Sequence, residues 1–521
     1  MASNLLKVLQ NAEKARTQMI ENANTVGIQA AKNESLLSLS SRFLQINNRD
    51  VSLEYKGPHW IRPQEWPDTK SLLKNAPVRD GLHPAYIALF GEDCPLKTTI
   101  ANKARSDIEL QCQGVYTSDG QWYTDFTNPI EHVWDTSKDI DGYRYLIVYM
   151  RRLNNFRNTV TWGGLHCLEL IVGALSGTGY FCSGYGNTYN SNNYFPYTYN
   201  YEHTADTHLT NIGNRFCNNM TRLQHVYIPH VTYLSAWSNM SPLYEFDAPD
   251  LEEAGGSSSP RVWTIKATVV NLPKFSKINT YGNDADIIIE SNTMQDLSLP
   301  SFVGNENAII ISGGFQLRNL DLPVLKQARS IIANSNAREL TTLHLPELVS
   351  TKSDLIYGSG MGSGMFPKLT TIDAPNLIST GYLYRVDIYN GEFAHEHQRT
   401  YLKNINIGEG CSYNANYLFC NNLDIKEYTF NPTHVLTGVV YMFGYCYSLN
   451  KINFYDNFKV NNLDFTYCRT LTHDSLVDML NKLADVTGEG TTYTLKLGDF
   501  NLGKLTAEEV ATGTNKGWTI S

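Results

Sequence analysis

The residues best suited to hold a metal ion are His395-Glu396-His397, the densest group of ligand-type side chains in the chain. Alternate residues of an extended segment point the same way, so His395 and His397 can reach one ion. Zinc takes three or four protein ligands, and no third ligand is evident here. Asp284 and Asp286 offer oxygens to calcium but do not complete an oxygen cage. We therefore expect no bound metal and no cofactor.

Motifs for catalysis are absent from the sequence. It contains no G-x-S-x-G, no P-loop and no H-E-x-x-H. Carboxylate pairs for glycoside hydrolysis have no fixed spacing in sequence, and depolymerases on β-solenoids use scattered Asp and Glu residues. A polysaccharide depolymerase stays open as an alternative, but we expect a protein without catalytic residues that is not an enzyme.

The residues best suited to recognition lie in segment 180–201, which holds seven Tyr, two Phe, five Asn and no charged residue. A tyrosine ring with its polar tip stacks on sugars or protein at low entropic cost, and asparagine hydrogen-bonds hydroxyl groups. The alternative is an insertion packed on its own β domain or on a neighbouring subunit. The residues predicted to bind are Tyr185, Tyr189, Asn192, Asn193, Tyr194, Tyr197 and Tyr199.

Composition excludes several kinds of partner. The net charge is -9 and no long basic run occurs, which argues against nucleic acid and against anionic membranes. No segment approaches the roughly 18 to 20 apolar residues of a membrane span, and the N-terminus does not resemble a secretory signal. We expect synthesis in a cytosol, no membrane insertion, and export, if any, by lysis or a specialised route.

The nine cysteines contain no C-x-x-C pair, so the sequence predicts neither a disulfide framework nor a zinc site. Cys420, Cys446 and Cys468 occur once per repeat in the repetitive part of the chain. They are expected to form a buried column of small apolar side chains.

Residues 1–32 are predicted to form a helix with the seam of a coiled coil. Seam positions recur at steps of four and three, at Leu5, Leu9, Ala12, Arg16, Met19, Ala23, Val26 and Ala30. An Ala-rich seam makes a weak core, so we expect segment 1–50 to anchor the chain or to form a homo-oligomer, with a trimer favoured. The contacts would come from Leu5, Leu9, Ala12, Met19 and Val26. A surface helix packed on its own domain is the alternative.

Residues 51–158 are predicted to form a small antiparallel β domain. Runs of strand composition at 84–90, 106–115, 121–126 and 143–150 are separated by turn residues. Short strands bounded by turns at this spacing are typical of a sandwich or barrel.

Residues 159–470 repeat the frame apolar-x-x-apolar-x-apolar-Pro-x-apolar, which is clearest in residues 317–325, 340–348 and 369–377. Its proline recurs at Pro229, Pro249, Pro273, Pro300, Pro323, Pro346 and Pro375. The steps lie inside the window of 20 to 29 residues for leucine-rich repeats. A repeat this short cannot bury its own apolar face, so neighbouring repeats must stack into a solenoid.

The frame also predicts local geometry. Its last two apolar residues alternate and point inward from one short strand, and proline ends the strand because it lacks an N–H. Outward residues such as Asp321, His344 and Asp373 should line up on the sheet face.

Residues 471–521 are predicted to be an α/β cap that covers the end of the stack. Asp474 is the expected N-cap of a helix with Leu476, Leu480 and Leu483 on one face. A strand is expected at 491–497, followed by a second helix that begins at the capping box Thr506–Glu509 and by a final strand at 518–520.

An aromatic residue, sometimes with a cysteine, precedes several repeat strands, as in Phe216-Cys217 before Leu223 and Phe443 with Cys446 before Leu449. With the proline-ended strand, this pattern resembles the BspA-like leucine-rich repeat. The resemblance implies a mainly β leucine-rich-repeat solenoid, joined here to an N-terminal helix, a small β domain and an α/β C-terminal cap.

The chain ends are similar to those of appendage proteins of tailed bacteriophages that infect gut bacteria. The motifs are Leu480-Asn-Lys-Leu483, Leu495-Lys-Leu497, Asn515-Lys-Gly517-Trp518 and the stretch 26–44. The resemblance implies a tail or head fibre protein of the virion that is made in the host cytoplasm. Its partners would be other virion proteins and a host-surface glycan or protein. A bacterial BspA-like surface adhesin is the alternative.

Overall fold

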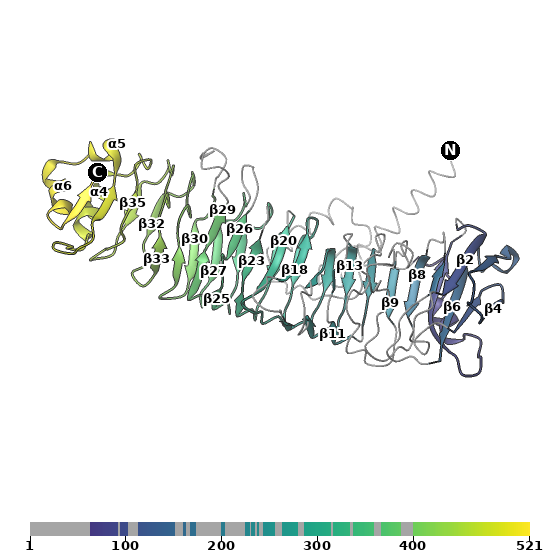
Figure 1. The fold of residues 1–521 in the computed structure, drawn as a ribbon. Coiled ribbons are helices and arrows are strands. Elements are labelled where there is room, and N and C mark those ends of the chain that lie inside the picture. The colour runs from purple at the N-terminus through teal and green to yellow at the C-terminus, as the bar shows by residue number, and fades with distance from the viewer. Residues whose placement is uncertain are drawn as a thin grey trace, which may run out of the picture. The chain divides into compact units, whose positions relative to one another are not determined.

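The computed structural model describes a large part of the chain and leaves several segments outside the description. The described residues are 63–91, 94–102, 113–151, 160–162, 167–172, 200–203, 224–229, 231–234, 237–238, 243–255, 263–279, 286–313, 316–333, 337–358, 366–386 and 400–521. The predicted N-terminal helix lies outside them. The described part is mainly β and contains a parallel β-solenoid of about ten turns (Figure 1).

The region before the solenoid is antiparallel, as predicted from the strand-like runs at 84–90, 121–126 and 143–150. Of the fourth predicted run, 106–115, only residues 113–115 are described. Its elements are α3 (Thr69–Lys74), β1 (His83–Phe90), β2 (Lys97–Asn102), β3 (Gly114–Thr117), β4 (Trp122–Tyr123), β5 (Ile130–Val133), η2 (Thr136–Lys138), β6 (Arg144–Met150) and β7 (Val160–Trp162). Strand β1 reads HPAYIALF and has six consecutive buried residues, which suits a central strand covered on both faces.

One nine-stranded sheet joins this antiparallel region to the first turns of the solenoid. Strand β1 pairs antiparallel with β6 on one side and with β8 (Cys167–Val172) on the other. From β8 onward every neighbour in the sheet is parallel. The predicted boundary at residues 158 and 159 therefore lies between strands of one continuous sheet, and β1 covers what would otherwise be the open edge of the solenoid.

The first side of the solenoid consists of the strands of the repeat frame and of one strand, Asn200–His203, whose residues do not follow the frame. These strands are β8, β9 (Asn200–His203), β10 (His225–Tyr227), β13 (Leu243–Asp247), β16 (Ala267–Asn271), β19 (Asp296–Ser298), β21 (Asn319–Asp321), β24 (Thr342–His344), β27 (Thr371–Ala374), β30 (Asn404–Ile407), β32 (Glu427–Thr429) and β34 (Lys451–Asn453). The frame is confirmed in detail for β24, since Leu343 and Leu345 are buried and the strand ends before Pro346.

The second side of each turn is shorter. It consists of β11 (Tyr233–Leu234), β14 (Glu253–Gly255), β17 (Lys277–Asn279), β22 (Gln327–Ala328), β25 (Ser350–Thr351), β28 (Ser379–Tyr382), β31 (Ser412–Asn414) and β33 (Val435–Gly438). A parallel bridge from Gly304 to Gln327 fills this place in the turn of β19.

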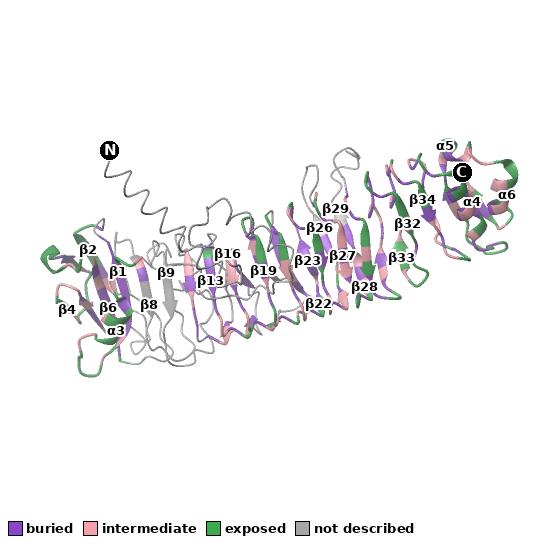
Figure 2. Ribbon diagram, turned by 180° about the vertical axis from the view of Figure 1, so that it is seen from behind, coloured by how far each residue is buried: buried purple, intermediate pink, exposed green. Residues whose placement is uncertain are grey.

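The third side carries strands up to residue 386 and tight turns after residue 400. The strands are β12 (Trp237–Ser238), β15 (Trp263–Thr264), β18 (Asp286–Ser291), β20 (Ala308–Gly313), β23 (Ser330–Ala333), β26 (Ile356–Gly358) and β29 (Tyr384–Val386). The core between the three sides is apolar, with Trp263, Phe275 and Phe302 stacked along it. Figure 2 shows buried and exposed residues alternating within the turns.

The C-terminal residues combine helices with a three-stranded parallel sheet. Its elements are β35 (Leu463–Asp464), α4 (His473–Lys482), β36 (Tyr493–Lys496), α5 (Gly498–Leu502), α6 (Ala507–Thr514) and β37 (Trp518–Ile520). The predicted capping box Thr506–Glu509 is confirmed. The predicted N-cap Asp474 is wrong: Thr472 caps α4 by accepting from the Ser475 N–H, which puts Asp474 in the first turn, where a carboxylate still favours the helix dipole.

Candidate functional site

The residues predicted to bind and to oligomerise all lie outside the described residues. This holds for segment 1–50, for His395 to His397, for Asp284 and for all seven predicted binding residues of segment 180–201. The last two residues of that segment begin β9, a parallel strand of the large sheet. These predictions therefore stay predictions.

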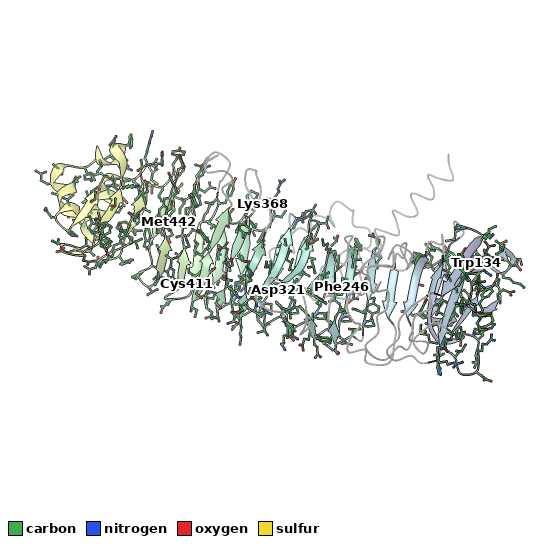
Figure 3. The ribbon with its side chains drawn as sticks, viewed as in Figure 1. Trp134, Phe246, Asp321, Lys368, Cys411 and Met442 are labelled. Carbon is green, nitrogen blue, oxygen red and sulfur yellow. The ribbon has the colours of Figure 1, made fainter. Side chains whose placement is uncertain are left out.

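The most distinctive surface feature is a set of stacked tyrosines on the third side of the late turns, which we call the tyrosine ladder: Tyr417, Tyr441, Tyr445, Tyr447 and Tyr467. The rings of Tyr417 and Tyr441 stack at 5.8 Å, and those of Tyr445 and Tyr467 stack at 4.2 Å. The ring of Tyr447 meets Tyr445 edge-on at 6.2 Å and is 48% exposed. Met442, labelled in Figure 3, marks their place in the fold.

Three residues of the tyrosine ladder have left-handed backbones. The φ angles of Tyr417, Tyr441 and Tyr445 are 61°, 50° and 59°, a region that bulky residues avoid at a cost of roughly 1 kcal/mol or more each. The backbone holds them there by bonding turn to turn. The N–H groups of Tyr417 and Asn421 donate to Val440 and Gly444, at 2.9 and 2.7 Å. The left-handed backbone is therefore a property of the fold, but it does not explain why these residues are tyrosines.

The preceding turn has a different residue at one of these left-handed positions. Asn421 takes the place in its turn that Tyr445 takes in the next, with a φ of 54°. Asparagine tolerates this conformation far better than tyrosine, so the fold does not require an aromatic ring there. The sequence does place Tyr417 and Tyr441 at the same position in two repeats. It does not show the left-handed backbone that makes these tyrosines unusual.

The surroundings of the tyrosine ladder carry no charge over long stretches. Residues 411–422 and 435–450 contain no Asp, Glu, Lys or Arg. Exposed apolar side chains lie among the tyrosines, with Val440 at 50% exposure. Burial raises the pKa of Tyr417, and raises that of Tyr445 to about 12, so both phenols are neutral near neutral pH. An uncharged aromatic surface of this kind binds by stacking and by hydroxyl hydrogen bonds.

The outward face of the repeat strands carries the polar column that the sequence predicted. Asp321 (Figure 3) accepts from Ser298 at 2.7 Å, and Asp373 lies between His344 at 2.5 Å and Asn406 at 2.7 Å. Paired in this way, the side chains satisfy one another across turns. Their mutual bonding favours a role in aligning the strands.

A second column near the start of the solenoid is rich in carboxylates. Glu169, His225 and Glu245 belong to one column of the sheet, with Asn200 between Glu169 and His225, and Asp247 follows two residues after Glu245. The carboxylates are buried: Glu169 accepts from Thr69, and Asp247 accepts from Asn271 at 2.7 Å. Acid–base cleavage of a glycosidic bond uses a pair of carboxylates that flank the bond, but Glu245 and Asp247 are each only 2% exposed in this structure.

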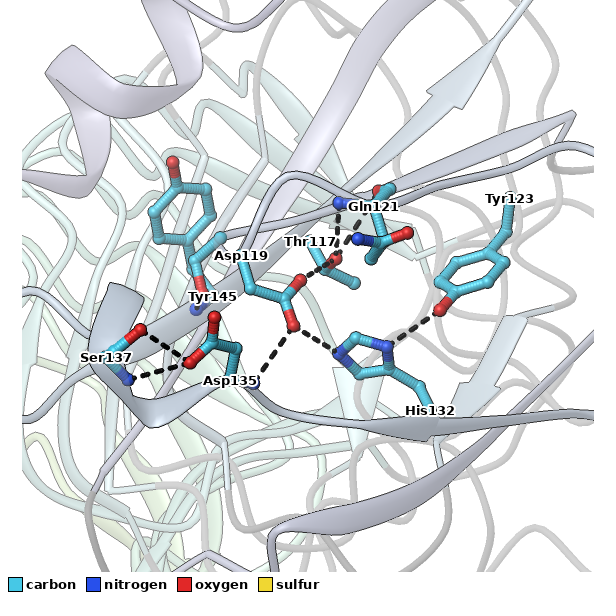
Figure 4. Close-up of polar contacts among 9 residues, drawn as sticks. Thr117, Asp119, Gln121, Tyr123, His132, Asp135, Ser137 and Tyr145 are labelled. Carbon is cyan, nitrogen blue, oxygen red and sulfur yellow. Dashed lines mark hydrogen bonds and ion pairs between the residues drawn. The ribbon is translucent and has the colours of Figure 1, made fainter.

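A buried His–Asp pair with a tyrosine lies in the antiparallel region (Figure 4). The Tyr123 hydroxyl lies 2.8 Å from His132 Nδ1, and His132 Nε2 lies 3.3 Å from Asp119 Oδ2 without an aligned hydrogen bond. Asp119 also accepts from Thr117 at 2.5 Å and from the Asp135 N–H at 3.2 Å. The side chains of His132 and Asp119 are 2% and 4% exposed.

An Asp–His–Tyr chain can relay a proton, but the electrostatics here oppose a nucleophilic tyrosine. Burial, with the charge of Asp119, raises the pKa of Tyr123, and burial lowers that of His132. The His132 ring packs edge-on against the ring of Trp134, with 4.5 Å between the ring centroids. The network ties the turn after β3 to β5, and its geometry fits that structural task.

Cys94, Cys411, Cys420, Cys446 and Cys468 are free and buried, and burial of the last three was predicted. The predicted column is wrong in one member. Cys446 and Cys468 donate to the carbonyls of Phe419 and Phe443 in the preceding turns, at 2.9 and 3.1 Å. In the turn before, the equivalent residue is Asn422, since Cys420 lies two residues earlier in the repeat. The cause is that Cys420 and Cys446 lie 26 residues apart, whereas equivalent residues of these two turns, such as Tyr417 and Tyr441, lie 24 apart.

Within the described ranges, no group of three His, Cys, Asp or Glu side chains is placed to hold a metal ion. None of the helices described is long and apolar enough to cross a membrane. Comparisons with protein-family models, with curated proteins and with solved structures gave no match.

Acid is expected to destabilise the fold through His132, His225 and His434. Burial lowers the pKa of each ring, to about 4 for His225. Because the folded pKa of each ring lies below the unfolded value of about 6.5, protonation favours the unfolded chain. The stabilisation is therefore complete above about pH 6.5 and is lost as the pH falls toward the folded pKa. Each ring removes up to about 1.4 kcal/mol per pH unit in that window, less where solvent reaches it.

The measurement is the urea midpoint between about pH 7 and about pH 5, a range in which most unfolded carboxylates stay ionised. We expect the midpoint to fall, and the fall to be smaller in the variant His434→Leu. A midpoint that is constant over this range would contradict the prediction.

Proposed function

We propose that this chain is a non-enzymatic recognition protein that binds a host cell surface through the tyrosine ladder. The observation that carries the proposal is the placement of Tyr417, Tyr441 and Tyr445 at left-handed positions, although asparagine serves at residue 421, the equivalent of Tyr445 in the preceding turn. Strained bulky residues on a surface are retained where they serve a function. Their rings lie in an uncharged surrounding suited to stacking.

We further propose the biological setting that the resemblance implies. The solenoid is a BspA-like leucine-rich-repeat domain, and residues 471–521 are its C-terminal cap. The chain is a tail or head fibre protein of a virion, made in the host cytoplasm, and segment 1–50 joins it to other virion proteins or into a homo-oligomer, a trimer being favoured. Support comes from the repeat frame and from the end motifs. A bacterial surface adhesin would use the same surface.

The test compares binding of the fluorescently labelled full chain and its Tyr445→Asn variant to a panel of whole gut bacteria. Asparagine is chosen because residue 421 holds it in the same backbone conformation, so the fold should be kept. We expect wild type to bind at least one strain and the variant to bind it at least tenfold more weakly, because one aromatic stack is lost.

The matched control is Tyr244→Asn, since Tyr244 is 45% exposed and lies in β13, outside the tyrosine ladder. It should bind like wild type. Equal binding by Tyr445→Asn, with an unchanged circular dichroism spectrum, would count against the tyrosine ladder. Soluble sugar released from the cells by the wild-type chain would instead favour the depolymerase alternative and direct attention to Glu245 and Asp247.

A further inference from the structure

A buried column of thiol and amide side chains runs from the late turns of the solenoid into the C-terminal cap. Cys446 and Cys468 each donate to the carbonyl of a core phenylalanine in the preceding turn. Asn501 of α5 donates from Nδ2 to the carbonyl of the next phenylalanine in this series, Phe465, at 3.2 Å. Phe465 stacks on Phe443, the phenylalanine of the turn before, at 5.3 Å. Asn501 therefore follows Cys468 in the column.

The residue before each member of this column reaches the surface. In the last two turns of the solenoid these residues are Tyr445 and Tyr467 of the tyrosine ladder, whose rings stack at 4.2 Å. In α5 the residue is Phe500, which directly precedes Asn501 and is 55% exposed. Alignment of the turns therefore places Phe500 next after Tyr467, across the junction between the solenoid and its cap.

A lysine orders the exposed ring of Phe500. Lys504 Nζ lies over this ring, 4.7 Å from its centroid. The same ammonium group donates to the carbonyls of Arg469 and Leu471 at 2.8 and 2.7 Å, and to Asn501 Oδ1 at 3.0 Å. These bonds use all three N–H donors of the group, so the cation is fixed on one face of the ring. A ligand that packs on an ordered ring loses less conformational entropy than one that must first immobilise it.

An exposed cation lies at the same junction. Arg469 follows Cys468 in the chain, which is the place that Tyr447 takes after Cys446 in the turn before. Its guanidinium group makes no ion pair within the part of the chain that the structure describes, the nearby Asp499 of α5 included. A guanidinium group that is free in this way can pair with a carboxylate or a phosphate through two parallel hydrogen bonds.

These features define the chemistry that the surface can recognise. The exposed rings of Tyr447 and Phe500 can pack on apolar C–H faces, and the phenols of the tyrosine ladder can exchange hydrogen bonds with hydroxyl groups. The stretch from Tyr445 to Phe500 covers three successive positions, about 10 Å at a strand spacing near 4.8 Å, which exceeds one sugar ring. With the cation of Arg469, the surface fits a chain of sugars that carries an anionic group.

We propose that the tyrosine ladder continues onto the cap and binds an acidic polysaccharide, whose sugar rings pack on Tyr467 and Phe500 and whose carboxylate or phosphate group pairs with Arg469. The inference rests on the proposed function, because it names the ligand of the same surface and extends that surface across the junction. The net charge of the chain is -9, which disfavours acidic polymers at long range, so the local cation decides the binding.

The experiment uses the full chain and the polysaccharide extracted from a strain that the wild-type chain binds. Calorimetry compares the untreated extract with extract whose carboxyl groups are reduced to alcohols and with extract dephosphorylated by hydrofluoric acid. We expect one of the two treatments to weaken binding at least about tenfold, because the charged hydrogen bonds to Arg469 are lost. The proposal is overturned if the untreated extract does not bind, or if neither treatment changes its binding. Loss of cell binding after protease treatment of the bacteria would assign the receptor to a protein and overturn it as well.

Two variants locate the contacts. Phe500→Ala removes the exposed ring, and Arg469→Tyr introduces the residue that the preceding turn holds as Tyr447. Each should bind the untreated extract at least about tenfold more weakly with an unchanged urea midpoint, whereas Lys326→Gln, which removes an exposed cation from an earlier turn, should bind like wild type. Full binding by both variants would overturn this inference and, if Tyr445→Asn still lost binding, would leave the proposed function intact. Full binding by Tyr445→Asn as well would overturn both.

Discussion

Replacing Phe443 by alanine is expected to unfold the late turns of the solenoid at conditions under which the earlier turns stay folded. Phe443 is fully buried, and its ring stacks between Phe419 at 5.5 Å and Phe465 at 5.3 Å. Tyr428 and Phe430 meet it at 5.3 and 6.0 Å. Truncation leaves a cavity in the centre of this cluster, and a buried Phe→Ala change costs about 3–5 kcal/mol.

The loss should be local because each turn of a solenoid contacts only its neighbours. Hydrogen exchange by mass spectrometry should show loss of protection in residues 400–521 and little change in residues 263–358. The matched control is Phe500→Ala, since Phe500 is 55% exposed and its loss should cost less than about 1 kcal/mol. Uniform loss of protection along the chain would contradict the local model.

The solenoid could be predicted from the sequence because its determinants are local. In the frame around Leu343 and Leu345, the alternation fixes which side chains enter the core, and Pro346 fixes where the strand ends. The capping box Thr506–Glu509 is likewise encoded within four residues. Each of these signals depends only on residues that are close neighbours in the sequence.

The candidate sites could not be predicted, because they depend on comparison between turns. The segment chosen from composition, 180–201, lies mostly outside the described residues, whereas the tyrosine ladder depends on backbone angles set by bonds from Tyr417 and Asn421 to the following turn. That Phe500 takes the place after Tyr467 becomes apparent only once the turns are aligned in space. Repeat length varies, so the offset between equivalent residues changes along the chain: it is 24 from Asn422 to Cys446 and 22 from Cys446 to Cys468.

The continuation of the sheet across residue 158 was hidden for a similar reason. Strand β1 is followed in sequence by antiparallel strands, and its pairing with β8 joins residues far apart in the chain. Both partners are apolar runs, and such runs do not reveal whether the neighbour is parallel or antiparallel. Long-range pairing of this kind needs the three-dimensional arrangement.

A glycine between two turns should be nearly as sensitive to substitution as the aromatic cluster. Gly304 has a φ of +79°, and a Cβ added there would lie 2.0 Å from the Gln327 carbonyl oxygen and 2.5 Å from Leu325 Cδ1. The oxygen belongs to the backbone of the next turn and cannot rotate away. Gly304→Ala combines a left-handed backbone cost of about 1 kcal/mol with an overpacking cost of about 1–3 kcal/mol.

Gly410→Ala separates these two costs, because Gly410 has a φ of +71° and no atom within 4 Å of the added Cβ. It should lose only the backbone part, about 1 kcal/mol. Urea unfolding of both variants measures the difference, and equal losses would show that the contact with Gln327 is relieved at no cost. A larger loss for Gly304→Ala would mean that the parallel bridge between these turns is held at a separation that only glycine allows.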